Sequence, residues 1–476
     1  MSGQRPTRAF IMIWDGMRPD LVSPELTPRL AALAADGVTF DAHHAVLPTV
    51  TRVNAATLAT GAPTAVHGLP ANVFFAPAVD ARAPISVGEG DNVARLRQAY
   101  GVFAAPTVAD VVRANGGRTA IVSSGTRGSA QMLHPRRQDL GDLILHPTLS
   151  TPAELGPIVE RLGPMPESDA PNTARNRWLA RAAAEIVLPE RRPELLMFWH
   201  DEPDHSQHAY GFGHPLSLRA IREADDHLGI VLDGLEVAGL REETLVIVAS
   251  DHGYAHISGR LDLRPALAAF ANQADVMLAT NGCSVLLHLA RPDVLLVEQI
   301  AGAVRQVPGV GAVFSGVRGG PVVDGTFPLA PLGIDGPLAP DLLVTLAWSD
   351  DQNEHGYRGV SYEHGTKNQA SHGGASSWEI RNTLVMQGPG VASGVRSGLP
   401  SGIGDLAPTL LSILGLPTPG SMAGRVLAEA LDGPNGTSRT DTSPDTAVRR
   451  WEETSPAGLL RWSEYAGRRY LDEARR

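Results

Sequence analysis

Four apolar runs of strand length recur along this chain, and three of them end in acids or in an Asp-His pair. They read AFIMIWD, RTAIVSSG, ELLMFWHDEPD and TLVIVASDHG, at residues 9–15, 118–125, 194–204 and 244–253. Helical patterns alternate with them, at residues 27–37, 107–117, 174–187 and 218–239. Apolar runs of this kind are typical of strands buried on both faces. The order predicts an α/β fold with a doubly wound, mostly parallel sheet, whose ligands bind beyond the carboxyl ends of the strands.

The remaining patterns divide the chain into a core and additions to it. Residues 1–260 form the expected first part of the α/β core, and residues 348–432 form its return. Residues 261–347, where strand and helix patterns are separated by Gly and Pro, predict a smaller inserted α+β subdomain. Residues 433–476 comprise a polar linker and a basic C-terminal tail, which is expected to pack back as a helix.

Composition and charge exclude several classes of protein. The formal net charge of −11 and the pI near 5.8 argue against binding a nucleic-acid polymer. No run approaches the roughly 18 apolar residues of a membrane span, and the N-terminal apolar run is too short for a signal peptide. We therefore expect a cytoplasmic protein as the sequence is written, or an exported mature form. A single cysteine, Cys283, excludes a disulfide framework and a thiolate metal cluster.

Acids and histidines that can bind metals lie in four separate segments of the chain. They are Asp15, the pair Asp204 and His208, the pair Asp251 and His252, and the glycine-flanked His355, His364 and His372. The first pair shares one face if its segment is helical, because its members are four residues apart. Singly, such residues suit turns and caps. Together they predict a divalent metal site, and Zn²⁺ is the usual choice for mixed histidine and carboxylate ligands.

The order of these segments, together with further motifs, resembles a known superfamily. Asp15 is followed by the motifs PTVTRVN, TG and HG, then by EPDxxxH, SDHG and a late HGG, and residues 405–427 form a matching closing segment. This set is similar to the alkaline phosphatase superfamily, in particular to type I phosphodiesterases and nucleotide pyrophosphatases. The similarity covers most of residues 9–430 and implies an alkaline phosphatase-like fold.

The resemblance also implies a role for each residue of the site. It assigns one metal ion to Asp204, His208 and His372, and the other to Asp15, Asp251 and His252 with the Thr51 oxygen as a further ligand. Both ions are expected to be Zn²⁺. Thr51, the second threonine of PTVT, takes the place of the nucleophile. Asn72, in HGLPANVFF, takes the place of the residue that hydrogen-bonds the phosphoryl oxygen.

The implied activity is hydrolysis of a phosphodiester or nucleotide pyrophosphate bond in a small-molecule substrate, through a phospho-threonine intermediate. Two metal ions stabilise both the attacking and the leaving oxygen of such a displacement. Thr51 suits a second role as well, as the N-cap of a helix over RVNAATLA. Thr49 is the rival nucleophile on sequence alone.

Three positions depart from the family pattern or leave an assignment open. Gln207 precedes the metal histidine where the family usually has glycine. Arg52 follows the nucleophile at a position where nucleotide-cleaving relatives have an apolar or aromatic residue. Its guanidinium either binds an additional negative charge on the substrate or forms a salt bridge to a neighbouring loop. His364 and His372 both precede glycine, and the segment after His372 is the better match.

Other functions compatible with these motifs stay open. A phosphonate hydrolase that cleaves the C–P bond of a substrate such as phosphonoacetate uses a similar Thr and Asn, and Arg52 suits its compact, charged substrate. A phosphomonoesterase is the next alternative. A metal-binding but catalytically silent binding protein is the alternative from another class, although a complete set of ligands and a nucleophile argue against it. The sequence leaves the oligomeric state open.

Overall fold

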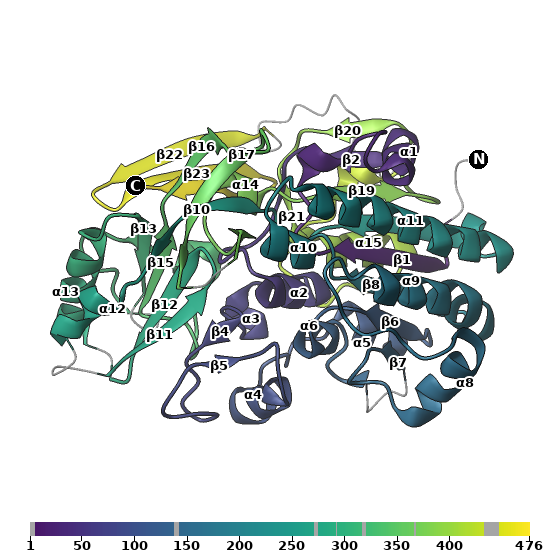
Figure 1. Cartoon of the computed structure of the whole chain (residues 1–476), viewed down its shortest axis with the longest axis horizontal. Coiled ribbons are helices and arrows are strands. Elements are labelled where there is room, and N and C mark those ends of the chain that lie inside the picture. Colours follow the sequence, from purple (N-terminus) through teal and green to yellow (C-terminus); the bar gives the residue numbers. More distant parts are fainter. Residues whose placement is uncertain are drawn as a thin grey trace.

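A computed structural model describes residues 5–137, 142–270, 275–291, 293–316, 320–365, 368–432 and 447–476. At its centre lies an eight-stranded sheet with the order β20-β2-β19-β9-β1-β8-β6-β7 (Figure 1). The strands are β1 (Arg8–Trp14), β2 (Val38–Phe40), β6 (Thr119–Ser123), β7 (Leu143–Leu145), β8 (Leu195–His200), β9 (Thr244–Ala249), β19 (Leu384–Gln387) and β20 (Val395–Ser397). Only β19 runs antiparallel to its neighbours, β9 and β2, within this sheet as described. The predicted doubly wound, mostly parallel sheet is confirmed.

Helices cover both faces of this sheet, which explains why its strands are apolar throughout. Along β1, Phe10 and Met12 point to one hydrophobic cluster and Ile11 and Ile13 to the other. The first cluster is completed by α1 (Pro28–Asp36), α9 (Thr173–Ala182) and α11 (Pro215–Val237), and the second by α2 (Thr51–Thr60), α5 (Val108–Ala114) and α15 (Leu406–Leu414). No helix in the described ranges has the length and apolar character to cross a membrane.

The segment predicted as an insertion contributes a sheet with a hydrophobic cluster of its own (Figure 1). This five-stranded sheet has the order β11-β12-β15-β13-β14, and α13 packs on it. Its elements are β11 (Val276–Asn281), β12 (Ser284–Leu289), α13 (Val294–Arg305), β13 (Val310–Ser315), β14 (Phe327–Pro328) and β15 (Leu342–Leu346). Before and after it, β10 (Ala255–Leu261) and β17 (Arg358–His364) pair in parallel. The domain boundaries at 260 and 347 stay a prediction.

The C-terminal tail is not the helix that we expected. It forms an antiparallel sheet of β22 (Arg449–Ser455), β23 (Gly458–Tyr465) and β24 (Arg468–Arg475). Aromatic side chains in this tail favour strands, and the turns between strands use Gly458 and Gly467 at positive φ. The N–H of Ala474 donates to the carbonyl of Ala375, which ties the tail to the core. The predicted linker falls almost wholly on residues 433–446, outside the described residues.

Candidate active site

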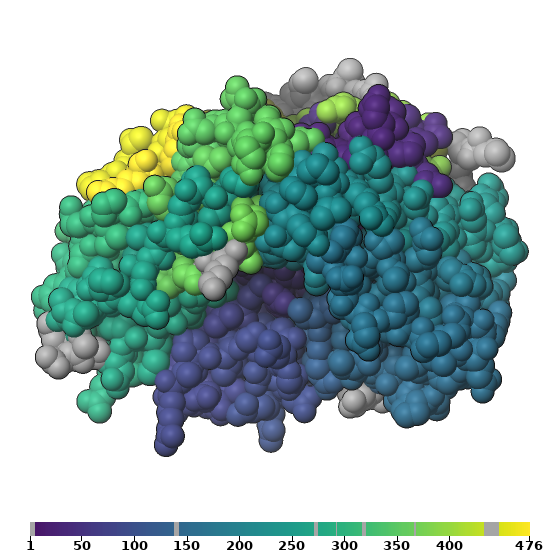
Figure 2. All heavy atoms as spheres, viewed as in Figure 1, coloured from purple at the N-terminus to yellow at the C-terminus, as the bar shows by residue number. Residues whose placement is uncertain are grey.

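The predicted metal ligands gather at the carboxyl ends of β1, β8 and β9, as expected for this kind of sheet. Asp15 directly follows β1, and Asp251 follows β9. Asp204 begins the helix α10 (Asp204–Tyr210), which places His208 one turn further along the same face. His372 comes from the loop after β18 (Ala370–Ser371). Figure 2 shows a hollow on this side of the molecule, and in the same view α2 lies behind it (Figure 1).

One group of ligands surrounds Asp204. Its Oδ1 lies 3.2 Å from Nε2 of His208 and 3.3 Å from Nε2 of His372. Both rings hydrogen-bond a backbone carbonyl through Nδ1, His208 that of Ala370 at 2.9 Å and His372 that of Thr49 at 2.8 Å. Such a bond fixes the ring with Nε2 toward the carboxylate, which is how metal-binding histidines are usually held.

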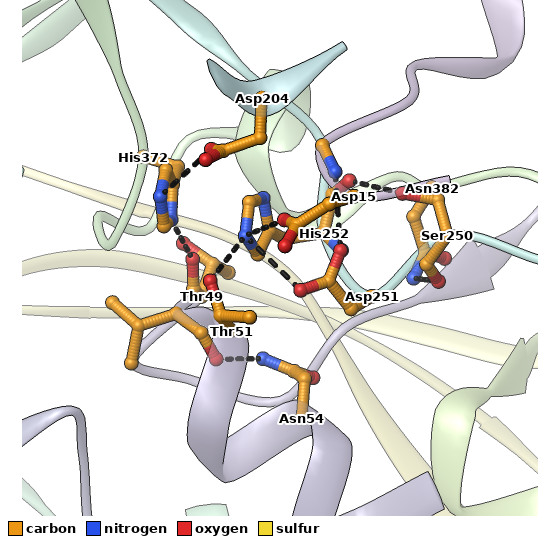
Figure 3. A network of polar contacts seen from close by, with 12 residues as sticks. Asp15, Thr49, Thr51, Asn54, Asp204, Ser250, Asp251, His252, His372 and Asn382 are labelled. Carbon is orange, nitrogen blue, oxygen red and sulfur yellow. Dashed lines mark hydrogen bonds and ion pairs between the residues drawn. The ribbon is translucent and has the colours of Figure 1, made fainter. Parts of the chain in front are cut away.

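The second group surrounds His252. Its Nε2 lies 3.4 Å from Oδ1 of Asp15 and 3.2 Å from Oδ2 of Asp251, while its Nδ1 bonds the Gly253 carbonyl at 2.9 Å. Oγ1 of Thr51 is 3.4 Å from the same Nε2 (Figure 3). The threonine hydroxyl therefore faces this group of ligands.

The donor atoms fit two divalent cations. In one set, ligand atoms of Asp204, His208 and His372 all lie within 4.8 Å of one another. The same holds in a second set, which consists of Asp15, Asp204 and His252. Oδ1 of Asp15 and Oδ2 of Asp251 are buried and have no hydrogen-bond partner in the described part of the chain. A buried carboxylate oxygen without a partner is costly, and a metal ion at this position removes that cost.

The electrostatics of the pocket also favour cations. Burial, together with the neighbouring charges of Asp251 and Asp204, raises the pKa of Asp15 well above its usual value. Burial, with a contribution from Asp204, raises the pKa of Asp251 to about 8. Burial works against the charge of Asp204 too, but His208 and His372 hold its pKa well below the usual value. Three carboxylates in one buried site repel one another unless positive charge lies between them.

Two aromatic donors that the sequence analysis did not single out hold the carboxylates. Nε1 of Trp199 donates to Oδ2 of Asp15 at 2.9 Å, and the hydroxyl of Tyr254 donates to Oδ1 of Asp204 at 2.9 Å. Trp199 lies just before the DEPD motif and Tyr254 just after SDHG. Their position in the sequence, beside the motifs of the candidate ligands, could have identified them, because residues next to metal ligands commonly orient those ligands by hydrogen bonds.

Thr51 and Thr49 have different surroundings. Thr51 is the first residue of α2; the N-cap is Val50, which makes no side-chain capping hydrogen bond. The hydroxyl of Thr51 is thus not a cap, which was its alternative role. Oγ1 of Thr49 donates to the carbonyl of Gly374 at 2.8 Å and accepts from the N–H of Gly373 at 3.0 Å. Thr49 therefore holds the loop that carries His372.

Asn72 and Arg52 lie beside the start of α2. Oδ1 of Asn72 accepts the backbone N–H of Arg52 at 2.8 Å, which leaves its NH₂ group as a donor. Nε of Arg52 donates to Oγ1 of Thr126 at 3.3 Å. No carboxylate pairs with this guanidinium within the described ranges, so the expected alternative of a salt bridge is absent there. Burial lowers the pKa of Arg52, although Asp15, Asp204 and Asp251 act to raise it.

The two remaining open positions also have defined surroundings. His364 bonds Oγ1 of Thr280 through Nδ1 at 3.1 Å and accepts the N–H of Leu263 through Nε2 at 3.2 Å. Both ring nitrogens of His364 are occupied, so His372 is the histidine beside Asp204. Gln207 is buried, and its Nε2 donates to the carbonyl of Gly16 at 3.2 Å. The residue in place of the family's glycine therefore supports the segment after Asp15.

The fold and the candidate site together define the alkaline phosphatase-like class. The sheet is mostly parallel, and carboxylates and imidazoles lie at its strand ends beside a threonine at the start of a helix. The model of one family, type I phosphodiesterase/nucleotide pyrophosphatase, matches residues 9–303. The chain belongs to this metal-dependent family.

Individual relatives are distant and cover different lengths. A bis(5′-adenosyl)-triphosphatase of Bos taurus is 25% identical over 264 residues, which are 54% of this chain and 49% of that protein. Venom phosphodiesterase 2 of Crotalus adamanteus is 32% identical over 97 residues, 20% of this chain and 11% of the relative. The chain thus spans about half or less of the length of these curated relatives.

Solved structures show the same fold. Murine ectonucleotide pyrophosphatase/phosphodiesterase 5 superposes with a TM-score of 0.63 at 17% identity, over 87% of this chain and 96% of the murine chain. An inactive variant of that murine protein, in complex with AMP, superposes with the same TM-score.

Proposed function

We propose that this chain is a two-metal hydrolase that cleaves phosphodiester or nucleotide pyrophosphate bonds, with Thr51 as the nucleophile and Zn²⁺ as both ions. The observation that carries the proposal is the position of Oγ1 of Thr51, 3.4 Å from Nε2 of His252 and at the start of α2. Membership of the family supports the reaction type. The mixed carboxylate and imidazole donors support zinc.

Each group of ligands is assigned one ion in this proposal. Asp204, His208 and His372 hold one, and Asp15, Asp251 and His252 hold the other. When bound, the ions supply Lewis-acid stabilisation of the oxygens at phosphorus and lower the pKa of a hydroxyl or water. The hydroxyl of Thr51 gives up its proton and its oxygen attacks phosphorus, forming an Oγ–P bond while the bond to the leaving oxygen breaks. That oxygen takes up a proton and departs as an alcohol when the substrate is a phosphodiester. Water then hydrolyses the phospho-threonine and restores the hydroxyl.

Hydrogen-bond donors around Thr51 stabilise the charge that develops on the phosphoryl oxygens. The NH₂ group of Asn72 is the proposed side-chain donor, since its carboxamide oxygen is held by the N–H of Arg52. The N-terminus of α2 adds backbone N–H groups and the positive end of a helix dipole. Removing one such donor from a comparable site costs about 10²–10³-fold in kcat.

Arg52 supports a substrate that carries a second negative charge near the scissile phosphorus. Its guanidinium lies beside Gly88, where an added Cβ would sit 3.1 Å from Nη2, and it has no carboxylate partner among the described residues. The names of two neighbours, a bis(5′-adenosyl)-triphosphatase and a protein in complex with AMP, support a nucleotide-like substrate. Phosphonoacetate also carries a second charge, so the phosphonate hydrolase stays the second candidate.

A panel of substrates tests the proposal on zinc-loaded protein and its Thr51→Ala variant. The panel comprises bis-p-nitrophenyl phosphate, the p-nitrophenyl ester of a nucleotide, p-nitrophenyl phosphate and phosphonoacetate. We expect hydrolysis of the two diesters, reduced at least about a thousand-fold in the variant. Phosphate release from phosphonoacetate alone would replace the diesterase with a C–P hydrolase, and preference for the monoester would indicate a phosphomonoesterase. Zinc binding without turnover of any substrate would favour the silent binding protein.

A further inference from the structure

The hairpin between β11 and β12 reaches from the inserted five-stranded sheet to the candidate active site. Asn281 ends β11 and Ser284 begins β12, so the turn consists of Gly282 and Cys283. This tip contacts two loops that are far apart in the sequence. One carries Asn72, and the other carries His372.

The side chain of Asn281 is committed to the loop of Asn72. Its Oδ1 accepts the backbone N–H of Asn72 at 3.0 Å and that of Val73 at 3.0 Å. Its Nδ2 donates to the carbonyl of Val73 at 2.9 Å and to that of Ala279 at 3.3 Å. Asn281 is buried, with 3% of its surface exposed, so water does not replace these bonds in the folded protein.

The backbone of the same tip is locked against the loop of His372. The N–H of Cys283 donates to the carbonyl of His372 at 2.9 Å. A Cβ on Gly282 would lie 2.1 Å from that carbonyl oxygen, and a Cβ on Gly373 would lie 2.0 Å from the carbonyl oxygen of Asn281. Both approaches require glycine, so the backbone of the tip packs directly against the loop of His372.

These contacts form a continuous path from the inserted sheet to the nucleophile. Asn281 fixes the backbone of Asn72, and Oδ1 of Asn72 accepts the N–H of Arg52, the residue that follows Thr51. A group that stabilises a transition state has to be held within about 0.5 Å of its productive position. The position of the Asn72 carboxamide therefore depends on a residue of another sheet.

We propose that Asn281 is a positioning residue, which holds Asn72 where its NH₂ group meets the phosphoryl oxygen. The inference rests on the proposed function, because it gives Asn72 a role in the transition state. Asn281 contacts the backbone of the Asn72 loop, and it affects the reaction only through the position of Asn72. Its loss is expected to displace the donor, and a displacement of about 1 Å can cost about 10²-fold in rate.

A double-mutant cycle tests this inference with zinc-loaded, full-length protein and bis-p-nitrophenyl phosphate. The variants are Asn72→Ala, Asn281→Ala and the double variant. We expect Asn281→Ala to lower kcat by about 10- to 100-fold and to change KM by less. The double variant should be no more than about twofold slower than Asn72→Ala, because both changes remove the same interaction. Losses that multiply in the double variant would overturn the inference, since Asn281 would then act independently of Asn72.

A variant on the same hairpin provides the matched control. Thr280 bonds Nδ1 of His364 at 3.1 Å and has no hydrogen bond to the loop of Asn72 in the described residues. Thr280→Val should change kcat by less than about twofold, and zinc content and thermal midpoint are measured for every variant. A loss of kcat in Thr280→Val as large as that in Asn281→Ala would overturn the inference, because the hairpin would then act only through stability.

A conservative variant covers the case in which Asn281→Ala does not fold. Asn281→Asp keeps the acceptor for the N–H groups of Asn72 and Val73 and loses the donor to the Val73 carbonyl. It should retain more kcat than Asn281→Ala, and it takes the place of the alanine variant in the cycle with the same expected coupling to Asn72. Thr51→Ala distinguishes failure of the proposed function from failure of the proposed role of Asn281. An active Thr51→Ala overturns the proposed function, whereas an inactive one with multiplying losses overturns only the role of Asn281.

Discussion

The imidazole rings of His252 and His372 are stacked, with their centroids 3.7 Å apart and their planes 12° apart. One ring belongs to each proposed metal site, so the two sites are directly adjacent. The carboxylate of Asp204 lies within 4.8 Å of ligand atoms in both groups, whereas Asp251 contacts only His252 of these two histidines in the described residues. The two carboxylates are therefore not equivalent.

Metal content should separate Asp204 from Asp251. We expect about two zinc ions per wild-type chain and about one in Asp251→Ala. Asp204→Ala should hold less than one, because Asp204 is a ligand of its own assigned ion and its carboxylate also lies within 4.8 Å of the Asp15 and His252 ligand atoms of the other. Metal analysis after dialysis measures this, with Asp226→Ala, a change of an exposed acid on α11, as the control. A single lost ion in Asp204→Ala and two in Asp251→Ala would contradict the assignment.

Replacement of Thr49 should weaken metal binding without removing the nucleophile. Thr49→Val deletes both hydrogen bonds that hold the loop of His372. Loss of such an outer contact usually costs about 10- to 100-fold in metal affinity or activity. We expect activity to recover with excess zinc, and Thr49→Ser to resemble the wild type. Activity that is absent at every zinc concentration in Thr49→Val would instead make Thr49 the nucleophile.

Arg52 should discriminate among substrates by charge. Arg52→Gln should raise KM by about tenfold or more for a dinucleoside triphosphate, since a hydrogen bond to a charged group is worth about 1.5–3 kcal/mol. It should change KM for bis-p-nitrophenyl phosphate much less. The control is Arg127→Gln, a nearby arginine that pairs with Asp91. Equal effects on both substrates would exclude a charge-specific role for Arg52.

The C-terminal sheet should contribute to the stability of the core. The hydroxyl of Tyr470 donates to Oδ2 of the buried Asp405 at 2.9 Å. Tyr470→Phe removes this bond and also the one that Nε of the charged Arg425 donates to the Tyr470 oxygen at 3.2 Å, so we expect the free energy of unfolding to fall by about 1.5–3 kcal/mol. Urea denaturation of this variant and of Tyr362→Phe, whose side chain is exposed, measures the difference. Identical midpoints in the two variants would show that the tail is not energetically coupled to Asp405.

The sequence predicted the centre of this fold well because its signals there are local. The strands β1 (Arg8–Trp14) and β9 (Thr244–Ala249) are largely apolar runs, and a residue of the candidate site, Asp15 or Asp251, follows each of them. The prediction of a helix for the tail, the segment that contains Trp451 and Trp462, was wrong. They are opposite residues on paired strands, and the breaks at Gly458 and Gly467 were the local signal for turns.

The supporting contacts of the site were not predictable in the same way. Asn281 meets Asn72 only because a hairpin of the inserted sheet packs against a loop of the core. Likewise, the contact of Thr49 with Gly373 depends on how two distant loops meet. Neither contact leaves a periodic pattern or a fixed spacing in the sequence. The candidate ligands could be picked out from the sequence because their motifs occur in a recognisable order.

The stereochemical course of hydrolysis tests the central claim most directly. The substrate is a p-nitrophenyl ester of a nucleotide that is chiral at phosphorus through one sulfur atom, and hydrolysis takes place in ¹⁸O-labelled water. Attack by Thr51 followed by attack of water inverts phosphorus at each step, so the account predicts net retention of configuration. Net inversion would contradict it, because water would then displace the leaving group directly and Thr51 would carry no phosphoryl group.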